Sequence, residues 1–384
     1  MMLRAERLSA NDRDEALFVL NSAFSNETHT ADFERNLPIM WTGEHDYMAR
    51  HFGVRENGRL IALLGVYPLP VRIAGHDLLF STVGNVATLQ ASRGKGCMKL
   101  LMDAAMQELA AIGADASRLD GLRSRYNRFG YDHAGAAIHF TLTARNAKEN
   151  PAPQTFRFVP IAQDDREAVL FARSCQQRAG MYALRPTHLD FYMSMKAWQN
   201  VPYLAVDEQG APAGYLCASP DGKSIAETGT IKDGLLLPIL QSFLLERSLP
   251  ALSFMLPPWD TDAVRAAFEV CESWFVRPAS MFKIVSWDRV AGALLDLSAS
   301  LRPLPDGTAR IAIKGWGTLE LSVSSGKSSA AKTDAPADVS LDPRAAGQLL
   351  FGPLLPASLM RLPAGSALAS WLPLPLSWNG QDRV

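Results

Sequence analysis

The most informative stretch of the sequence runs from residue 83 to residue 131 and combines a strand pattern, a glycine-rich turn, a helix pattern and an aromatic segment. Residues 83–89 favour a buried strand. The turn at 93–96 contains two glycines, and from 98 to 112 apolar residues recur at spacings of three and four, as in an amphipathic helix. The sequence therefore predicts a glycine turn that leads directly into the N-terminus of a helix.

Such a turn suits a pyrophosphate group, because the first turn of a helix has unpaired N–H groups and the positive end of the helix dipole. Gly94 and Gly96 allow the backbone to approach a ligand closely, and Arg93 and Lys95 add positive charge. Two common phosphate loops are excluded. A Walker loop requires G-x-x-x-x-G-K-[ST], which is absent, and a dinucleotide fingerprint requires G-x-G-x-x-G, whereas residues 98–99 are Met-Lys.

The turn resembles the coenzyme A loop of the GNAT acetyltransferases, R/Q-x-x-G-x-G/A, over residues 93–98. Downstream, residues 126–131 read Tyr-Asn-Arg-Phe-Gly-Tyr and resemble the Y-x-R-F-G-Y/F stretch of the enhanced intracellular survival (Eis) branch of that superfamily. In the alternative interpretation, residues 93–99 are only a turn and a helix cap, and the aromatic residues at 126–131 are ordinary core residues. The two motifs together, in the expected order, favour the coenzyme site.

The resemblance implies that acetyl-CoA is the co-substrate and that no metal is required. The strand backbone at 86–88 would hold the pantetheine arm, and the turn would face the pyrophosphate. Tyr126 would be the general acid that protonates the leaving thiolate. In the Eis branch the C-terminal carboxylate returns to the active site, so the α-carboxylate of Val384 is the candidate base. The implied coenzyme-binding residues are Val86, Ala87, Thr88, Arg93, Gly94, Lys95, Gly96, Cys97 and Met98.

The acceptor side of the site is expected in the segment from His29 to Trp41, since the corresponding early helical region lines the acceptor site in GNAT proteins. Asp32 and Glu34 could attract a cationic amine, and Trp41 could supply an apolar or cation–π wall. In the alternative interpretation these charges are a solvated helix face.

Two positions just before the aromatic motif differ from the Eis pattern. Leu119 and Gly121 stand where Eis proteins commonly carry His and Ser. The resemblance therefore does not predict a polycationic aminoglycoside as acceptor. Polyamines, amino sugars, peptide amines and lysines all stay open.

The chain of 384 residues is longer than a single domain usually grows, and units at 1–147, 148–285 and 286–384 are expected. The fold class is α/β (α+β). The Eis resemblance implies tandem GNAT-type folds, the second without a coenzyme loop, followed by a sterol-carrier-protein-like α+β domain. The strand from Ile138 to Thr143 is expected to close the first unit, and the polar segment from Ser324 to Pro336 is expected to be mobile.

Composition narrows the expected partners. The 38 basic and 39 acidic residues nearly cancel, so neither nucleic acid nor a membrane is expected as partner. The four cysteines form no C-x-x-C pair, which indicates neither a disulfide framework nor a zinc site. The first residues lack the apolar core of a signal peptide. A cytoplasmic homo-oligomer that acts on a small-molecule or peptide amine is the expected setting.

The chain ends in an apolar, proline-containing segment from Trp371 to Val384 that carries two tryptophans. Termini are usually frayed and polar, so this composition predicts docking into a groove. Two interpretations stay open: the tail delivers its carboxylate to the acceptor amine, or it only packs between domains or subunits.

The predicted activity is acetyl transfer to a primary amine by direct attack in a ternary complex. The alternative is a non-catalytic acyl-CoA-binding or regulatory protein whose third domain binds an apolar ligand. Met98, where the coenzyme motif has a small residue, favours the alternative, and Tyr126 favours the enzyme.

Overall fold

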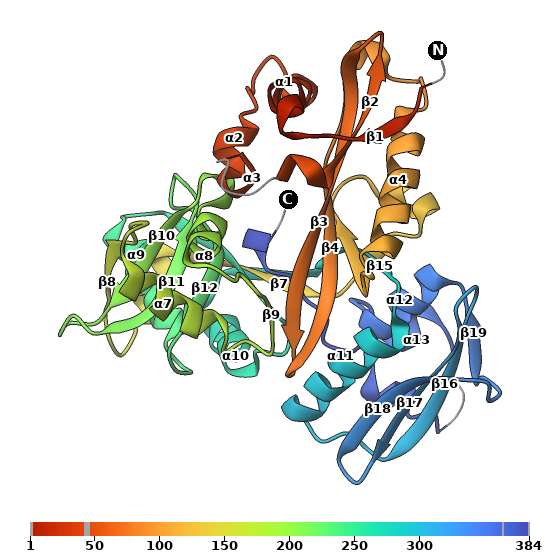
Figure 1. The fold of residues 1–384 in the computed structure, drawn as a ribbon. Coiled ribbons are helices and arrows are strands. Elements are labelled where there is room, and N and C mark those ends of the chain that lie inside the picture. The colour runs from red at the N-terminus through yellow and green to blue at the C-terminus, as the bar shows by residue number, and fades with distance from the viewer. Residues whose placement is uncertain (1–2, 42–46, 363–364, 383–384) are drawn as a thin grey trace.

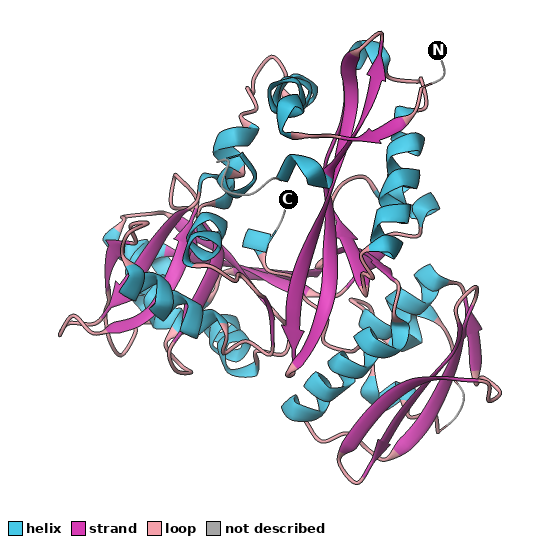
Figure 2. Cartoon of the chain, in the orientation of Figure 1, coloured by secondary structure: helices cyan, strands magenta, loops and turns pink. Residues whose placement is uncertain are grey.

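The protein, seen in a computed structural model that describes residues 3–41, 47–362 and 365–382, contains three β-sheets with helices packed on their faces (Figure 1). Figure 2 separates the helices from the strands and shows the three sheets in three parts of the molecule. Within the described ranges, no helix combines the length and the apolar character needed to cross a membrane.

The first sheet has the strand order β1-β2-β3-β4-β5-β15-β6, and β9 pairs with the end of β3. Its strands are β1 (Ala5–Arg7), β2 (His51–Glu56), β3 (Arg59–Ile73), β4 (His76–Thr88), β5 (Ala116–Leu119), β6 (Asp132–Ala134), β9 (Met181–Ala183) and β15 (Ser280–Ile284). The helices that accompany it are α1 (Arg13–Phe24), α2 (Phe33–Asn36), α3 (Pro38–Trp41), α4 (Cys97–Ala111) and α5 (Arg123–Tyr126).

The two faces of this sheet are covered by different helices, because successive side chains of a strand point to opposite faces. On β3, Ala62 and Leu64 pack in the cluster that includes the buried face of α4. Leu63, between them, packs with α1, α2 and α3 instead. The candidate coenzyme strand, β4, therefore lies between two apolar layers.

Strands β4 and β5 separate after a short parallel pairing. The pairing runs from Phe80, opposite Ala116, to Thr82, opposite Arg118, and ends there. On its other edge, β4 pairs with β3 through a bulge, since the register shifts between Leu63 and Gly65. Beyond Thr82, β4 thus has a backbone edge that β5 does not use.

The second sheet has the order β14-β7-β13-β12-β11-β10-β8. Its strands are β7 (Ala137–Thr143), β8 (Arg157–Pro160), β10 (Val201–Val206), β11 (Pro212–Ala218), β12 (Ser224–Thr230), β13 (Ala251–Leu256) and β14 (Ser273–Arg277). The accompanying helices are α6 (Ala144–Glu149), α7 (Arg166–Gln176), α8 (His188–Met195), α9 (Leu236–Glu246) and α10 (Thr261–Val270).

The second sheet repeats the separation of two parallel strands seen in the first. Strands β12 and β13 pair only at Ser224–Ser253 and Ile225–Phe254. The turn between β12 and α9 contains one glycine, Gly234, and one basic residue, Lys232, next to the acidic Asp233. The first turn has two glycines and two basic residues, and the absence of a coenzyme loop from the second unit stays a prediction.

The prediction that the strand from Ile138 to Thr143 closes the first unit was wrong. This strand, β7, lies in the second sheet, where it pairs with β13 and β14. Its place in the first sheet is taken by β15, which pairs with β5 and β6. Phe140 and Leu142 are buried in the core of the second sheet, which accounts for the exchange.

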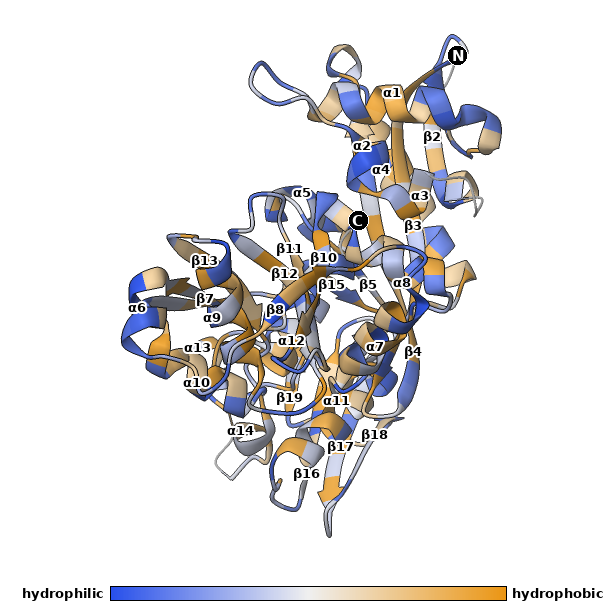
Figure 3. Ribbon diagram, turned by 90° about the vertical axis from the view of Figure 1, so that its left-hand side faces the viewer, coloured by the Kyte–Doolittle hydropathy of each residue, from blue (hydrophilic) through white to orange (hydrophobic). Residues whose placement is uncertain are grey.

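The third sheet has the order β18-β17-β16-β19. It contains β16 (Gly307–Ile313), β17 (Gly317–Ser324), β18 (Lys327–Thr333) and β19 (Val339–Leu341), with helices α11 (Trp287–Leu301), α12 (Pro343–Phe351), α13 (Pro356–Leu359) and α14 (Leu368–Trp371). Buried hydrophobic residues recur along α11 and along β17, and those of both elements belong to one core. Figure 3 colours the ribbon by the hydropathy of each residue.

The prediction of a mobile segment from Ser324 to Pro336 was wrong for most of its length. Residues 327–333 form the edge strand β18, which pairs with β17 from Thr333 back to Lys327. Its side chains are polar because one face of an edge strand can stay in water. Polar composition alone did not distinguish this strand from a loop.

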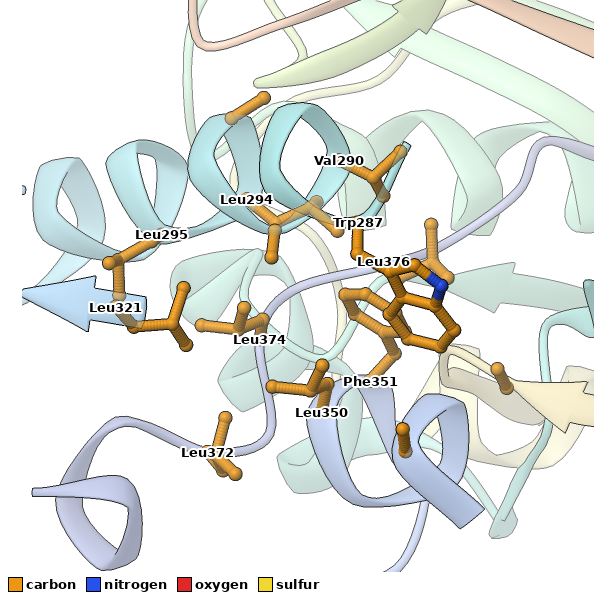
Figure 4. Close-up of a cluster of buried hydrophobic side chains, with 14 of the residues drawn as sticks. Trp287, Val290, Leu294, Leu295, Leu321, Leu350, Phe351, Leu372, Leu374 and Leu376 are labelled. Atoms are coloured by element: carbon orange, nitrogen blue, oxygen red, sulfur yellow. The ribbon is translucent and has the colours of Figure 1, made fainter. Parts of the chain in front are cut away.

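The C-terminal segment is buried, as its composition predicted. Leu372, Leu374 and Leu376 pack between α11 and α12 (Figure 4). Further on, the ring of Trp378 stacks on Phe80 of the first sheet at 5.7 Å between centroids. A Cβ on Gly380 would lie 2.7 Å from a backbone oxygen of β12, so the tail also contacts the second sheet closely.

Candidate functional site

The glycine turn enters α4 in the way the sequence predicted. Gly94 and Gly96 have φ values of 84° and 80°, in the region that glycine adopts without strain, and Gly96 is the N-cap of α4. A Cβ on either residue would meet no atom within 4 Å. Backbone conformation, not packing, explains the glycines, and the space in front of them is open to a ligand.

The start of α4 offers backbone donors and not a reactive thiol. Cys97 and Met98 are the first two helical residues, whose N–H groups have no acceptor within the helix. The Cys97 side chain is buried, and burial raises the pKa of its thiol. A thiol held protonated is a poor nucleophile. The residue can therefore contribute its backbone, and its side chain only packs.

The two basic residues of the turn differ in their surroundings. The Arg93 side chain is exposed. The Lys95 ammonium donates to both carboxylate oxygens of Glu56, at 2.8 and 2.7 Å. This ion pair is partly exposed on both sides, so Lys95 can exchange Glu56 for a phosphate at little cost.

The bulge in β4 is centred on Asn85, whose φ of 54° is unusual for a residue with a side chain. It lies directly before Val86, Ala87 and Thr88, the residues expected to hold the pantetheine arm. A bulge turns backbone groups out of the regular ladder. The residues that follow Asn85 therefore present backbone groups at the edge that β5 leaves free.

A chain of buried hydrogen bonds holds Asn85, and sequence reasoning missed it. The Nδ1–H of His51 donates to the Tyr47 carbonyl at 2.9 Å, which leaves Nε2 as an acceptor. The Tyr67 hydroxyl donates to this Nε2 at 2.7 Å, and the Asn85 amide nitrogen donates to the Tyr67 oxygen at 2.7 Å. Trp41 lies beside His51, with ring centroids 5.6 Å apart.

The side chains of this hydrogen-bond chain carry no charge. Burial lowers the pKa of His51 to about 4 and raises the pKa of Tyr67 well above its usual range, so both are neutral near pH 7. The only sequence signal was a polar residue at position 85 within an apolar strand.

The predicted acceptor residues have separate environments. Trp41 is buried in the apolar layer beside His51. Asp32 caps α2 by accepting from the Arg35 backbone N–H at 3.1 Å. Glu34 forms an ion pair with Arg13 at the surface. Both carboxylates already have partners within the protein. The structure does not bring them to the buried hydrogen bonds around Asn85.

Tyr126 ends helix α5 and is buried in the cluster that also contains Val83, Cys97 and Leu101. The cluster thus joins the candidate acid to the coenzyme strand and to α4. Burial raises the pKa of the Tyr126 hydroxyl, partly offset by the nearby charge of Arg125. Tyr126 therefore keeps its proton near pH 7, as a general acid must before it donates.

The segment after Tyr126 is fixed from a distant part of the chain. Lys283 of β15 donates to the Phe129 carbonyl at 3.1 Å. Gly130 has a φ of 90°, and a Cβ there would lie 2.7 Å from the Lys283 ammonium. Tyr131 is fully buried, and its hydroxyl is 2.7 Å from the Ser117 hydroxyl. The positive φ favours glycine at this position of the aromatic motif. Nothing in the sequence indicated that Lys283 would contact this segment.

The last two residues of the tail, including the candidate base Val384, lie outside the described residues. Asp382 accepts from the Arg185 guanidinium at 3.0 Å, and Arg185 also forms a bidentate pair with Glu227. Gln381 accepts from Asn200 at 2.9 Å. The side chains that make these contacts are all buried, so the tail is held firmly up to Asp382.

Among the described residues, no group of three or more His, Cys, Asp or Glu side chains is placed to hold a metal ion.

Comparison with known proteins identifies the fold. Residues 4–134 match the family model of the acetyltransferase (GNAT) domain. No curated protein matches the sequence. A conserved protein of unknown function from Enterococcus faecalis, described as a probable N-acyltransferase, has a similar structure with a TM-score of 0.70 at 16% identity, and 98% of each chain is covered.

Two further structures are similar over nearly the whole chain. A GCN5-related N-acetyltransferase from Anabaena variabilis has a TM-score of 0.70 at 15% identity, with 98% of each chain covered. Eis1 from Mycobacterium abscessus has a TM-score of 0.64 at 15% identity, with 100% of each chain covered. These similarities confirm the predicted α/β class and the tandem GNAT-type architecture.

Proposed function

We propose that the chain is an acetyl-CoA-dependent N-acetyltransferase of the Eis type, which transfers acetyl to a primary amine by direct attack in a ternary complex. One observation carries the proposal. The bulged strand β4 leaves β5 after Thr82 and continues through two left-handed glycines into the N-terminus of α4, and Tyr126 is buried in the same cluster. The GNAT domain match over residues 4–134 supports it.

The coenzyme fits the residues present at this site. The free backbone edge of Val86, Ala87 and Thr88 can pair with the amide groups of pantetheine. The N–H groups of Cys97 and Met98 and the dipole of α4 can receive the pyrophosphate, for which the glycines leave open space. Arg93 and Lys95 add positive charge at the same place.

In the reaction the amine nitrogen loses two protons and the sulfur gains one. A primary amine has an intrinsic pKa of about 10, so most of it is ammonium at neutral pH and must lose the first proton before attack. As the new C–N bond forms and the C–S bond breaks, the Tyr126 hydroxyl donates its proton to the departing sulfur, and the second proton released by the nitrogen restores the hydroxyl. No residue of the protein needs to carry the acetyl group.

The α-carboxylate of Val384 is our candidate for the base that takes the amine proton. The buried contacts of Gln381 and Asp382 support this role, because they fix the tail two residues before its end. Trp41 is proposed as an apolar wall for the acceptor. Asp32 and Glu34 are proposed to attract a cationic amine at the surface, in exchange for their present partners.

We further propose three units at 1–147, 148–285 and 286–384, with strands β7 and β15 exchanged across the first boundary and a sterol-carrier-protein-like third unit. The four-stranded third sheet, packed against α11, supports the last assignment.

Calorimetric titration of the full chain with acetyl-CoA, followed by a thiol-release assay over a panel of primary amines, tests the proposal. Saturable binding together with amine-dependent thiol release is the expected result. Binding without thiol release for every amine would favour the alternative, a non-catalytic acyl-CoA-binding protein. Absence of binding would overturn the coenzyme site.

A further inference from the structure

A separate cavity of about 230 Å³ lies where the first sheet meets the third unit. Its walls come from β6 and β15 on one side and from the β16–β17 turn and the start of α12 on the other. In Figure 1, α12 lies beside β15, on the side of the molecule away from α1. The cavity shares no lining residue with the glycine turn of the candidate coenzyme site.

Positive charge predominates in the lining of this cavity. Lys283, Lys314 and Arg344 contribute three cationic groups. The acidic residue of the lining, Asp132, already accepts two hydrogen bonds from Arg123, at 2.6 and 2.8 Å. A second carboxylate, Asp342, lies 3.9 Å from the Arg344 guanidinium, outside the lining. The charges that face the cavity are therefore not balanced within it.

The half-buried Lys283 ammonium is the strongest indication of a missing partner. It donates to the Phe129 carbonyl at 3.1 Å, and among the described residues it forms no ion pair, since the Asp132 carboxylate of the lining is paired with Arg123. An ammonium group has three donors, and a carbonyl satisfies one of them. Burial lowers the pKa of Lys283, since it takes the ammonium partly out of water. A buried cation without a counter-ion is costly, and an anion in the cavity would supply one.

The remaining walls are aromatic, with one unused polar atom. Phe282, Trp287 and Trp316 form the apolar part of the lining. The Nδ1 atom of His133 is buried and has no hydrogen-bond partner among the described residues. Flat apolar walls next to cationic groups are suited to a ligand that has a flat apolar body and an anionic end.

We propose that this cavity is a binding site for a small oxyanion, a carboxylate or a phosphate, carried on a flat apolar body. Lys283 is the principal charge partner of the oxyanion. Lys314 contributes from the opposite wall, and Trp316 covers the apolar body. This site is additional to acetyl transfer and does not depend on it.

The position of Lys283 gives such a ligand a physical connection to the candidate acid. The same ammonium holds the Phe129 carbonyl, three residues after Tyr126. An oxyanion bound to Lys283 would compete for its donors and so change how the segment after Tyr126 is held.

Calorimetric titration of the full chain without acetyl-CoA tests the site. The aromatic probes are benzoate and phenyl phosphate. Acetate and inorganic phosphate are their non-aromatic counterparts, which carry the same kind of charged group. All titrations are made at the same ionic strength. We expect one saturable site that binds at least one aromatic probe about tenfold more tightly than its non-aromatic counterpart. Tighter binding of benzoate assigns a carboxylate ligand, and tighter binding of phenyl phosphate assigns a phosphate.

Three variants locate the binding. Lys283→Met should weaken it at least about tenfold, as expected for loss of a partly buried charge partner. Lys314→Gln should weaken it less, and because Lys314 is exposed this variant should fold normally. Lys148→Met, at an exposed position on α6, is the matched control and should bind as the unmodified chain does.

Because a phosphate could also occupy the glycine turn, the titrations are repeated in Gly96→Asp, where aromatic anion binding should persist. The proposal is overturned if neither aromatic probe binds saturably, if the aromatic body adds no affinity, if both Lys283→Met and Lys314→Gln bind normally, or if Gly96→Asp abolishes binding.

Discussion

The ring of Tyr126 lies directly against the backbone of Gly121, so closely that a Cβ at position 121 would be 2.8 Å from Tyr126 Cε2. Real Cβ atoms do not approach another atom this closely, and Gly121 also has a φ of 140°. The glycine therefore gives the candidate acid its position. Gly121, one of the two positions at which the sequence differs from the Eis pattern, thus packs against the residue that we propose as the general acid.

We expect Gly121→Ala to lower turnover about tenfold or more and to leave acetyl-CoA affinity nearly unchanged, because it displaces the Tyr126 ring without touching the coenzyme turn. Steady-state kinetics and calorimetry with acetyl-CoA measure the two effects. Gly234→Ala is the matched control, since Gly234 also has a positive φ, 80°, but open space around it. Equal turnover in both variants would mean that the position of Tyr126 does not matter.

Tyr126→Phe should reduce turnover about a hundredfold or more, the scale expected for loss of a general acid, while coenzyme affinity is retained. The pH dependence gives a second readout. Turnover falls when an essential acid loses its proton, and burial raises the pKa of Tyr126 above its ordinary value of 10. The unmodified protein should therefore show no decline assignable to Tyr126 below about pH 10. Nearly normal turnover in the variant would assign Tyr126 to packing.

Gly96→Asp should abolish acetyl-CoA binding, because it places a side chain and a negative charge where a phosphate would meet the first N–H groups of α4. Gly210→Asp provides a control with matched strain. Gly210 has a φ of 85°, and a Cβ there would meet no atom within 4 Å, as at Gly96. Calorimetry should detect normal binding in the control, and normal binding in Gly96→Asp would remove the coenzyme from this turn.

His51 should make the stability of the fold depend on pH. Its pKa is about 4 in the folded protein against 6.5 ordinarily, so the unfolded chain binds the proton more readily. The neutral ring contributes stability that is complete above about pH 6.5 and is lost as the pH falls toward about 4. Between about pH 7.5 and about pH 5, this amounts to about 2 kcal/mol.

Urea unfolding at the two pH values measures this loss. The His51→Gln variant lacks the titrating ring, so its free energy of unfolding should fall by about 2 kcal/mol less over the same interval. An equal fall in both proteins would show that His51 is not the group responsible.

Local patterns in the sequence predicted the parts of the site that are local in the chain. The strand, the turn and α4 follow one another within residues 83–112, and their periodicity and glycine positions predict them directly. The apolar composition of the tail predicted its burial for a similar reason. Water excludes such a segment wherever it is folded.

Long-range pairings could not be predicted in this way. The exchange of β7 for β15 joins strands more than a hundred residues apart, and the apolar alternation of β7 suits either sheet. The hydrogen bonds that link His51, Tyr67 and Asn85 form only after three strands, β2, β3 and β4, are aligned. Lys283 reaches Phe129 from another part of the chain, and a single lysine has no sequence pattern that reveals such a contact.

The last prediction concerns the end of the tail. Arg185, Glu227 and Asp382 form a buried ionic cluster, and Gln381 bonds the backbone of α8. Removing residues from Gln381 onward would take the Asp382 carboxylate away from the buried Arg185 and break the hydrogen bonds of Gln381, so truncation would destabilise the fold and could not test catalysis cleanly.

Appending two glycines after Val384 is a sharper experiment, because it keeps every contact up to Asp382 and only moves the terminal carboxylate. If that carboxylate is the base, acetylation should fall about a hundredfold, whereas the thermal midpoint and the affinity for acetyl-CoA should stay unchanged. Thiol release, thermal unfolding and calorimetry on the same preparation measure the three quantities. Full activity in the extended protein would exclude the terminal carboxylate and leave Asp32 and Glu34 as the next candidates.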